Sequence, residues 1–318
     1  MNHTPLRQPA SRRRHARHGA AAGAALLFAA GCASTGSGEA MPERVIAVTD
    51  RNQIIEFVAG RPEHILARRS LSGIQDGERI VGMDFRPSNG RLYAVGNAGQ
   101  LYTIDLSTGI AEAIGSGGFR TLATGDLGVD FNPTVDRLRL VNAKGANLRI
   151  HPDTGAVVDA DPQSEGVQVD GELMYAPGDA HAGHTPRLAG AAYTNSQAGA
   201  TTTTNYAIDA ANGTLVTQGS GERAPTPVSP NTGRLFTVGS LGVNLGSGPV
   251  TFDIGAGNVA LVTATIPSGH SELYRINLMT GAASRIGRIG IGEAINAMAI
   301  VPVAGRSEGR SEGRGAGN

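Results

Sequence analysis

The sequence predicts an all-β fold, a five-bladed β-propeller, and three observations carry this prediction. A short phrase recurs along the chain: an apolar residue, a spacer, isoleucine and a polar residue. Short apolar runs alternate with turns, without the 3.6-residue periodicity of long helices. The two ends of the region resemble complementary parts of one repeat. Self-similarity over tens of residues indicates stacked copies of one supersecondary unit.

The recurring phrase stands at five places. Its copies are Tyr102-Thr-Ile-Asp105, Leu148-Arg-Ile-His151, Tyr206-Ala-Ile-Asp209 and Tyr274-Arg-Ile-Asn277, with a weaker one at Ile54-Ile-Glu-Phe57. Four of the five are followed within a few residues by Thr-Gly or Asn-Gly, which favour turns. Each copy is therefore expected to form part of a β-strand that ends in a turn.

The segment 80–114 has the pattern of one complete blade. Four β-forming runs, 80–85, 91–95, 100–104 and 110–114, are separated by turns rich in Pro, Asn and Gly. Four antiparallel strands in about 35–45 residues is the size of a propeller blade. A second copy begins at Leu127-Gly-Val-Asp-Phe131 and continues through 137–141 and 147–150 to 156–158.

Later copies are spaced more widely. The isoleucines of the phrase lie at positions 104, 150, 208 and 276, so the spacing grows from 46 to 58 and then 68 residues. We therefore expect inserted loops at 159–186 and 222–249. Counting the weaker copy gives five units, and six blades are the alternative if either inserted region contains another sheet.

The two ends of the repeat region predict how the ring closes. The segment 294–302 resembles the first strand of a blade, 80–87, but no strands follow it. The missing partners are at the amino end, in 45–48 and 54–58. Pairing of the N-terminal and C-terminal strands would complete this blade and remove two exposed sheet edges.

The first 31 residues are typical of an export signal, and Cys32 follows them. Five arginines and no acid precede an apolar run, 19–31, which is shorter than the roughly 20 residues that span a bilayer. Phe28-Ala-Ala-Gly31-Cys32 is similar to a bacterial lipobox, so Cys32 is the predicted lipidation site, with an ordinary signal peptide as the alternative. Residues 32–42 then form the lipidated cysteine and a flexible tether, 43–304 the propeller, and 305–318 a disordered tail. The resemblance implies an exported cell-envelope lipoprotein, at the outer membrane or the periplasmic face, that contacts the membrane through its lipid alone.

Charge and motifs exclude several classes of function. Without the five arginines of the signal, the chain has 22 basic and 27 acidic residues, which gives a net charge of −5. A mildly acidic surface repels phosphate backbones, so nucleic acid is not an expected partner. There is no Gly-x-x-x-x-Gly-Lys loop for nucleotide phosphates and no Gly-x-Ser-x-Gly elbow of a serine hydrolase. Asp136, Arg137, Arg139 and Arg149 are interpreted as ion pairs across the strands of one blade.

Three longer strings identify a family resemblance. They are 128–139, beginning Gly-Val-Asp-Phe-Asn-Pro, 147–155, and Ala192-Tyr-Thr-Asn195 with the threonine run 201–204 that follows it. These strings resemble the bacterial DUF4394 family of uncharacterised secreted or surface proteins. The resemblance covers nearly all of residues 43–302 and implies a β-rich, propeller-like exported domain. It implies no reaction and no functional residue.

Asp84 and Asp130 are the first candidates for a metal site. Each precedes a phenylalanine in the first strand of a blade, so alternation along the strand turns the carboxylate and the ring to opposite faces. Innermost strands line a propeller's channel, where converging carboxylates would suit Ca²⁺ as a cofactor. The matching residues of other copies are Ala192 and Ala299. The alternative is that each aspartate accepts backbone N–H groups and holds the blade in place.

His181 and His184 are the second candidate. With Asp179 they form the densest group of ligand-type residues, and histidines three apart can bind zinc when they share a face. They lie in a stretch rich in Gly, Ala and Pro, where a helix is not expected. The alternative interpretation is a solvated loop.

The sequence is consistent with three functions. The first is a non-catalytic, envelope-anchored binding or scaffolding propeller that presents its loops to a protein or glycan ligand. The second is an enzyme, a metal-assisted hydrolase or lactonase-like propeller that uses Asp84 and Asp130. The third is a matrix or adhesive protein without a concave site. A bound cation together with converging carboxylates in the channel would favour the enzyme, and a plugged or apolar channel would favour the scaffold.

Overall fold

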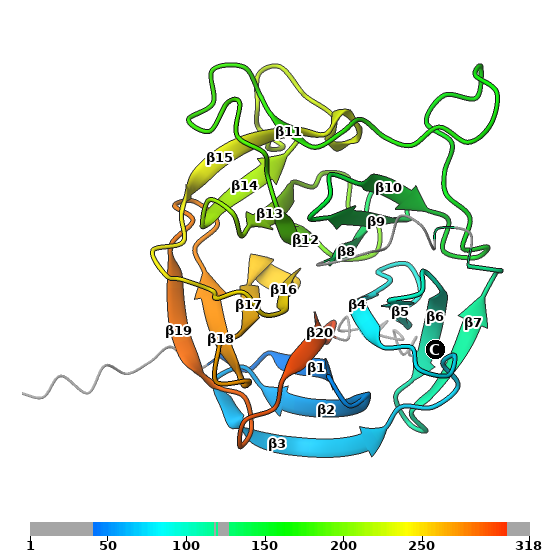
Figure 1. The fold of residues 1–318 in the computed structure, drawn as a ribbon, viewed down its shortest axis with the longest axis vertical. Helices are drawn as coiled ribbons and strands as arrows, with labels where there is room; N and C mark the ends of the chain where they lie inside the picture. Colours follow the sequence, from blue (N-terminus) through cyan, green and yellow to red (C-terminus); the bar gives the residue numbers. More distant parts are fainter. Residues whose placement is uncertain (1–40, 118, 120–126, 304–318) are drawn as a thin grey trace, which may run out of the picture. The chain divides into compact units, whose positions relative to one another are not determined.

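The computed structural model describes residues 41–117, 119 and 127–303. The predicted signal, Cys32, most of the tether and the predicted tail 305–318 lie outside these residues. Within the described part, the strands form five separate sheets arranged around a central axis (Figure 1). This confirms the predicted five-bladed β-propeller. No helix in the described ranges has the length and apolar character needed to cross a membrane.

The sheets are named blades A to E in chain order, and each is given from its innermost strand outward. Blade A contains β20 (Ile295–Ile300), β1 (Arg44–Thr49), β2 (Gln53–Val58) and β3 (Arg61–Ser70). Blade B contains β4 (Ile80–Phe85), β5 (Leu92–Gly96), β6 (Leu101–Asp105) and β7 (Ile110–Ile114). Blade C contains β8 (Leu127–Asn132), β9 (Arg137–Asn142) and β10 (Asn147–Ile150). Blade D contains β12 (Leu188–Tyr193), β13 (Asn205–Asp209), β14 (Thr214–Gln218), β15 (Arg234–Ser240) and the short β11 (Met174–Tyr175). Blade E contains β16 (Val250–Ile254), β17 (Ala260–Thr265), β18 (Ser271–Ile276) and β19 (Ala283–Arg288).

Blade A closes the ring as the sequence predicts. The last strand, β20, pairs antiparallel with the first, β1, from Val45 opposite Ile300 to Val48 opposite Ala297. Beyond this ladder, Val301 N donates to Arg44 O at 2.8 Å. Opposite ends of the described chain therefore lie in one sheet.

The inserted regions contain no sixth blade among the described residues. Region 159–186 contributes only β11, which pairs parallel with β15 at the outer edge of blade D. Region 222–249 is not a plain insertion, because it supplies β15 itself, preceded by the 3-10 turn η1 (Pro230–Thr232). The predicted fourth strand of blade C at 156–158 is reduced to an isolated bridge between Ile150 and Val157.

One copy of the recurring phrase is displaced by a strand. In blades A, B, C and E the phrase lies in the third strand from the axis, but in blade D it lies in the second, β13. The hairpin at Asn212-Gly213 then leads to β14, so region 222–249 must provide the outer strand. The uneven spacing of the phrase follows from this displacement as well as from inserted loops.

Glycines allow the inner strands to approach one another near the axis. A Cβ atom added to Gly82 would lie 2.4 Å from Cγ2 of Val129, and one added to Gly128 would lie 2.4 Å from the backbone N of Ala191. Each inner strand contacts both of its neighbours, and β8 also contacts β16. In the Gly-x-Asp pattern of β4 and β8, the glycine therefore allows the next inner strand to approach closely, and the aspartate two positions later faces the channel.

A buried ion-pair network attaches the first inserted region to blades C and D. Arg139 Nη1 donates to Asp170 Oδ2 at 2.6 Å, and Arg149 Nη2 donates to Asp170 Oδ1 at 2.8 Å. Arg139 also donates to the hydroxyl of Tyr193. The predicted pairing of both arginines within their own blade is wrong, because their carboxylate comes from the insertion. Asp136 pairs with Arg86 of blade B instead.

Candidate functional site in the central channel

Three inner strands bring an aspartate to the axis of the propeller. Asp84 lies near the end of β4, Asp130 near the end of β8 and Asp253 near the end of β16 (Figure 1 shows these strands around the centre). One carboxylate oxygen from each can be chosen so that all three lie within 4.8 Å of one another. Asp84 and Asp130, the residues predicted from the sequence, thus belong to one cluster with a third carboxylate.

Sequence reasoning missed Asp253. Its strand comes directly after region 222–249 in the sequence, and that region is predicted as an inserted loop. In addition, isoleucine takes the place of the phenylalanine that follows the other two aspartates. A signal was present, because Phe252-Asp253-Ile254 repeats the order apolar residue, aspartate, large apolar residue just before a glycine turn. The remaining two inner strands have Ala192 and Ala299 at this position, as expected.

Each aspartate also links its blade to the next one. Asp84 Oδ2 accepts a hydrogen bond from Phe131 N at 2.7 Å, and Asp130 Oδ1 accepts one from Tyr193 N at 3.0 Å. Asp253 Oδ2 accepts from Ile300 N. In each case the donor belongs to the next inner strand, and it is the residue directly after the position equivalent to the aspartate. The hydrogen bonds therefore join blades B to C, C to D and E to A.

The cluster is buried and carries no basic partner. The three residues are between 1% and 4% exposed. Among the described residues, no arginine, lysine or histidine forms an ion pair with any of them. Three carboxylates removed from water without a counter-charge are unfavourable in their ionised form. Protons or a cation must supply the missing positive charge.

The acidities follow from this environment. Burial, followed by repulsion from Asp253, raises the pKa of Asp84 well above its ordinary value. Burial, followed by repulsion from Asp84 and Asp253, does the same to the pKa of Asp130. Burial also raises the pKa of Asp253, to about 6, although its backbone hydrogen bonds act in the opposite direction. The site therefore retains protons at a pH where exposed carboxylates have lost them.

A cavity of about 600 Å³ lies over the cluster, at the end of the channel where the inner strands turn outward. Asp84 and Asp253 contribute to its lining together with Phe85, Ile254 and Ile300. The polar part of its rim comes from the turn between β12 and β13, with Ser196 and Gln197. Its other lining residues are Pro87, Gly90, Ala198, Gly255, Ala256, Pro302 and Val303. The two aspartates are the only titratable side chains in this lining.

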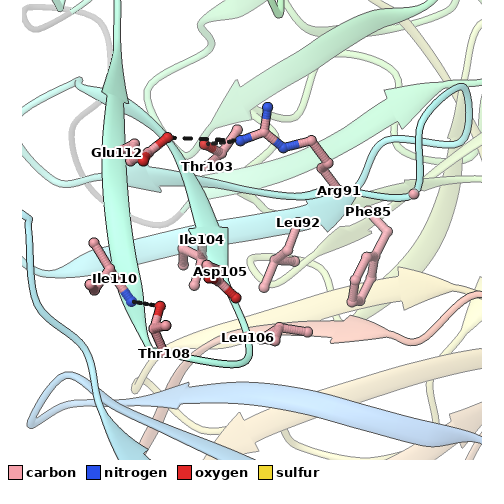
Figure 2. Close-up of a pocket in the computed structure, with 11 residues that line it drawn as sticks. Phe85, Arg91, Leu92, Thr103, Ile104, Asp105, Leu106, Thr108, Ile110 and Glu112 are labelled. Atoms are coloured by element: carbon pink, nitrogen blue, oxygen red, sulfur yellow. Dashed lines mark hydrogen bonds and ion pairs between the residues drawn. The ribbon is translucent and has the colours of Figure 1, made fainter.

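A neighbouring groove of about 520 Å³ continues from this cavity across blade B and shares Phe85 and Gly90 with it. Figure 2 shows its wall, with the guanidinium of Arg91 turned toward Thr103 and Glu112. Arg91 Nη2 donates to Thr103 Oγ1 at 2.9 Å and lies 4.0 Å from Glu112 Oε2. Arg91 and Glu112 lie within ion-pair distance in this wall, and Asp105 accepts hydrogen bonds from Ser107. The channel cavity, which reaches a cluster of three buried carboxylates, is the stronger candidate site.

The other predicted site residues lie elsewhere. His181 lies against Thr237 of β15, and His184 lies against Asn212 in the turn between β13 and β14. Neither histidine joins the channel cluster. Asp179, predicted with them, binds the backbone N of Thr237 in the same strand. Cys32 lies outside the described residues.

Comparisons with known proteins identify a family and leave the function open. The family model described as a domain of unknown function, DUF4394, matches residues 53–299. No curated protein matches. Among solved structures, dihydro-heme d1 dehydrogenase NirN in complex with DHE is similar, with 13% identity and a TM-score of 0.31. So is a structural genomics protein of unknown function from Bacteroides thetaiotaomicron VPI-5482, with 14% identity and a TM-score of 0.42. The matches cover 80% and 81% of this chain but only 44% and 66% of those proteins.

Proposed function

Since this chain belongs to the DUF4394 family, whose description assigns no activity, we propose from its site that it is a non-catalytic binding propeller. Its ligand enters the cavity at the mouth of the channel. Asp84, Asp130 and Asp253 hold a divalent cation at the floor of that cavity. The observation that carries the proposal is the convergence of three buried carboxylates, with no basic partner among the residues that the structure describes, beneath an open cavity.

The donor set favours Ca²⁺. Three carboxylate oxygens within 4.8 Å of one another can share one cation, because Ca–O bonds are about 2.3–2.6 Å long. Ca²⁺ takes about 6–8 oxygen ligands, so three aspartates leave coordination positions open. The cation also offsets the repulsion that raises the pKa values of these carboxylates. Bound cation and bound protons are therefore alternatives at this site.

The open positions define the class of ligand. A cation at the floor of the cavity binds hydroxyl or carboxylate oxygens, and the apolar wall formed by Phe85, Ile254 and Ile300 suits the face of a sugar ring or an apolar side chain. We therefore propose a glycan, or an oxygen-bearing segment of a partner protein, as the ligand. A rigid propeller with ligand-binding turns at its channel mouth fits this role.

The test is calcium binding followed by ligand binding. Titration calorimetry of the chain against Ca²⁺ should give one site, and Asp253→Asn should lose it. A glycan array probed with and without EDTA should then show binding that depends on both Ca²⁺ and Asp253. The exposed Asp76→Asn is a matched control for loss of one carboxylate. If neither Ca²⁺ nor EDTA changes the melting temperature or ligand binding, the proposal is wrong.

A metal-assisted hydrolase is the second candidate, and the same convergence of carboxylates favours it. A cation at this position can polarise a carbonyl or lower the pKa of a bound water. The cavity lining offers no second acid or base beside the aspartates, so binding remains the first proposal. Hydrolysis of ester and lactone substrates with Ca²⁺ or Mn²⁺ distinguishes the two, because turnover abolished by Asp253→Asn would favour the enzyme. The third function, an adhesive protein without a concave site, disagrees with the presence of this cavity.

We further propose that the propeller is held at the cell envelope by a lipid on Cys32. The support is the lipobox-like sequence that ends at Cys32. In this arrangement the lipid contacts the membrane, while the ligand binds at the mouth of the channel. Cys32→Ser should move the protein from the membrane fraction to the soluble periplasmic fraction, without changing Ca²⁺ binding. An unchanged membrane fraction for Cys32→Ser would contradict the anchor and leave the channel proposal intact.

A further inference from the structure

A second group of side chains of the metal-ligand type lies in the loop between β11 and β12, against blade D. His181 and His184 follow β11 in the inserted region, and their ring centroids are 5.6 Å apart with an interplanar angle of 68°. The ring of Tyr175 lies 5.3 Å from that of His181 and restricts its movement. His181 is partly exposed and His184 is exposed, so both rings are accessible from solvent.

Hydrogen bonds determine which nitrogen of His184 carries the proton. Asp209 is fully buried and accepts hydrogen bonds from the backbone N of Arg187 and Ala211. Its Oδ2 accepts a further bond from Asn212 Nδ2 at 2.8 Å, which turns Asn212 Oδ1 toward His184 Nδ1 at 3.3 Å. An amide oxygen only accepts, so Nδ1 of His184 must donate. Its Nε2 is left with a lone pair.

His181 is held in the same tautomer by a different set of contacts. Thr237 Oγ1 donates its one proton to Asp179 Oδ1 at 2.7 Å, since an ionised carboxylate only accepts. Thr237 Oγ1 therefore accepts from His181 Nδ1 at 3.0 Å. The Nε2 of His181 also keeps its lone pair.

We propose that the Nε2 atoms of His181 and His184 together bind a borderline transition metal, with Zn²⁺, Cu²⁺ and Ni²⁺ as the matching class. A metal-ligating histidine usually donates its second ring N–H to an oxygen that fixes its orientation, and both rings here do so. Zn–N bonds of about 2.1 Å place two imidazole centroids on one metal about 5 Å apart, close to the observed 5.6 Å. Imidazole suits these metals better than it suits Ca²⁺.

The site has two protein ligands. Among the described residues, the acidic and histidine side chains close enough to form a three-ligand metal group are Asp84, Asp130 and Asp253 alone. The remaining positions on the metal at His181 and His184 are therefore filled by water or by a donor from another molecule. The site is independent of the channel, both in its residues and in its preference for softer metals.

Zinc titration of the full chain in a Cys32→Ser background tests the proposal, because this background removes the only thiol. We expect one zinc site in the background, and its apparent affinity should fall about tenfold or more in His181→Gln/His184→Gln. The double variant His64→Gln/His270→Gln removes two histidines outside the pair and should bind zinc like the background. With Cu²⁺, the electron paramagnetic resonance spectrum should show two coupled imidazole nitrogens, and one in His184→Gln.

Thr237→Val examines the positioning of His181 without removing a ligand. Loss of the hydroxyl frees the His181 ring, so zinc affinity should fall by about tenfold while the two-nitrogen copper signal is retained but broadened. Equal zinc affinity in the background and the His181→Gln/His184→Gln chain, measured with unchanged melting temperature, would overturn the proposal. So would a copper spectrum without nitrogen coupling.

Discussion

Replacing Asp253 with asparagine should stabilise the metal-free propeller at neutral pH. Burial raises the pKa of Asp253 from 3.8 to about 6, so between these values the folded chain holds a proton that the unfolded chain has released. The contribution of this group to the unfolding free energy is fully present below pH 3.8, and it is lost as the pH rises through about 6. Asparagine keeps an oxygen for Ile300 N but has no charge to bury.

The magnitude follows from the same pKa. A rise of about two pH units at about 1.4 kcal/mol each is about 3 kcal/mol of unfolding free energy at neutral pH. For a domain of this size that corresponds to about 6–12 °C in Tm. Asp84 and Asp130 add to the penalty in the same direction, because burial and mutual repulsion raise their pKa values as well.

Differential scanning fluorimetry from pH 4.5 to 8, with EDTA or with millimolar Ca²⁺, measures the effect. In EDTA the wild-type Tm should fall toward neutral pH while Asp253→Asn falls less, so the two curves separate. Ca²⁺ should restore the wild type and leave the variant unchanged. Asp76→Asn, an exposed residue, should follow the wild type throughout. An Asp253→Asn protein less stable than wild type at pH 8 in EDTA would refute the reasoning.

Three other predictions concern the framework around the site. Asp170→Asn leaves the buried Arg139 and the partly exposed Arg149 without their carboxylate. It should reduce the unfolding free energy by about 3–5 kcal/mol in urea denaturation, whereas the exposed Asp161→Asn should have little effect. Equal midpoints would contradict the role of these ion pairs. Gly128→Ala forces a methyl group against the next inner strand and should cost about 1–3 kcal/mol, while Gly221→Ala, which meets nothing closer than 3.8 Å, serves as its control; equal losses would show that the close approach is unimportant. Deleting 295–318 removes β20 and should abolish the cooperative thermal transition seen by circular dichroism, and a retained transition would mean that the ring is stable while open.

The number of blades and the closure of the ring could be predicted because local signals repeat. The strands at 80–114 alternate apolar residues with Gly, Asn and Pro turns, and each rule acts over a few residues. The match between 294–302 and 80–87 then required β20 to find its partners at the amino end. These features depend on local chemistry and on the need to pair every sheet edge.

The channel cluster could be predicted only in part. Asp84 and Asp130 share the frame Gly-x-Asp-Phe, but Asp253 follows threonine and phenylalanine and precedes isoleucine. Its equivalence becomes visible only when β16 is recognised as an inner strand, which depends on β15 occupying region 222–249. The partner of Arg139 and Arg149 was missed for a similar reason, since Asp170 lies in an irregular segment whose position no periodicity encodes.

The pairing of the first strand with the last sets the order in which the chain can fold. Blades B to E each form from continuous stretches, but blade A must wait until the whole chain has been synthesised, and pairing at such separation is slow. Because Val301 N binds Arg44 O, a short linker could join the two ends of a chain trimmed to residues 41–303, and new termini could be placed at 71–79. Such a circular permutant makes every blade contiguous in sequence, and it should refold faster than the natural chain to the same ring.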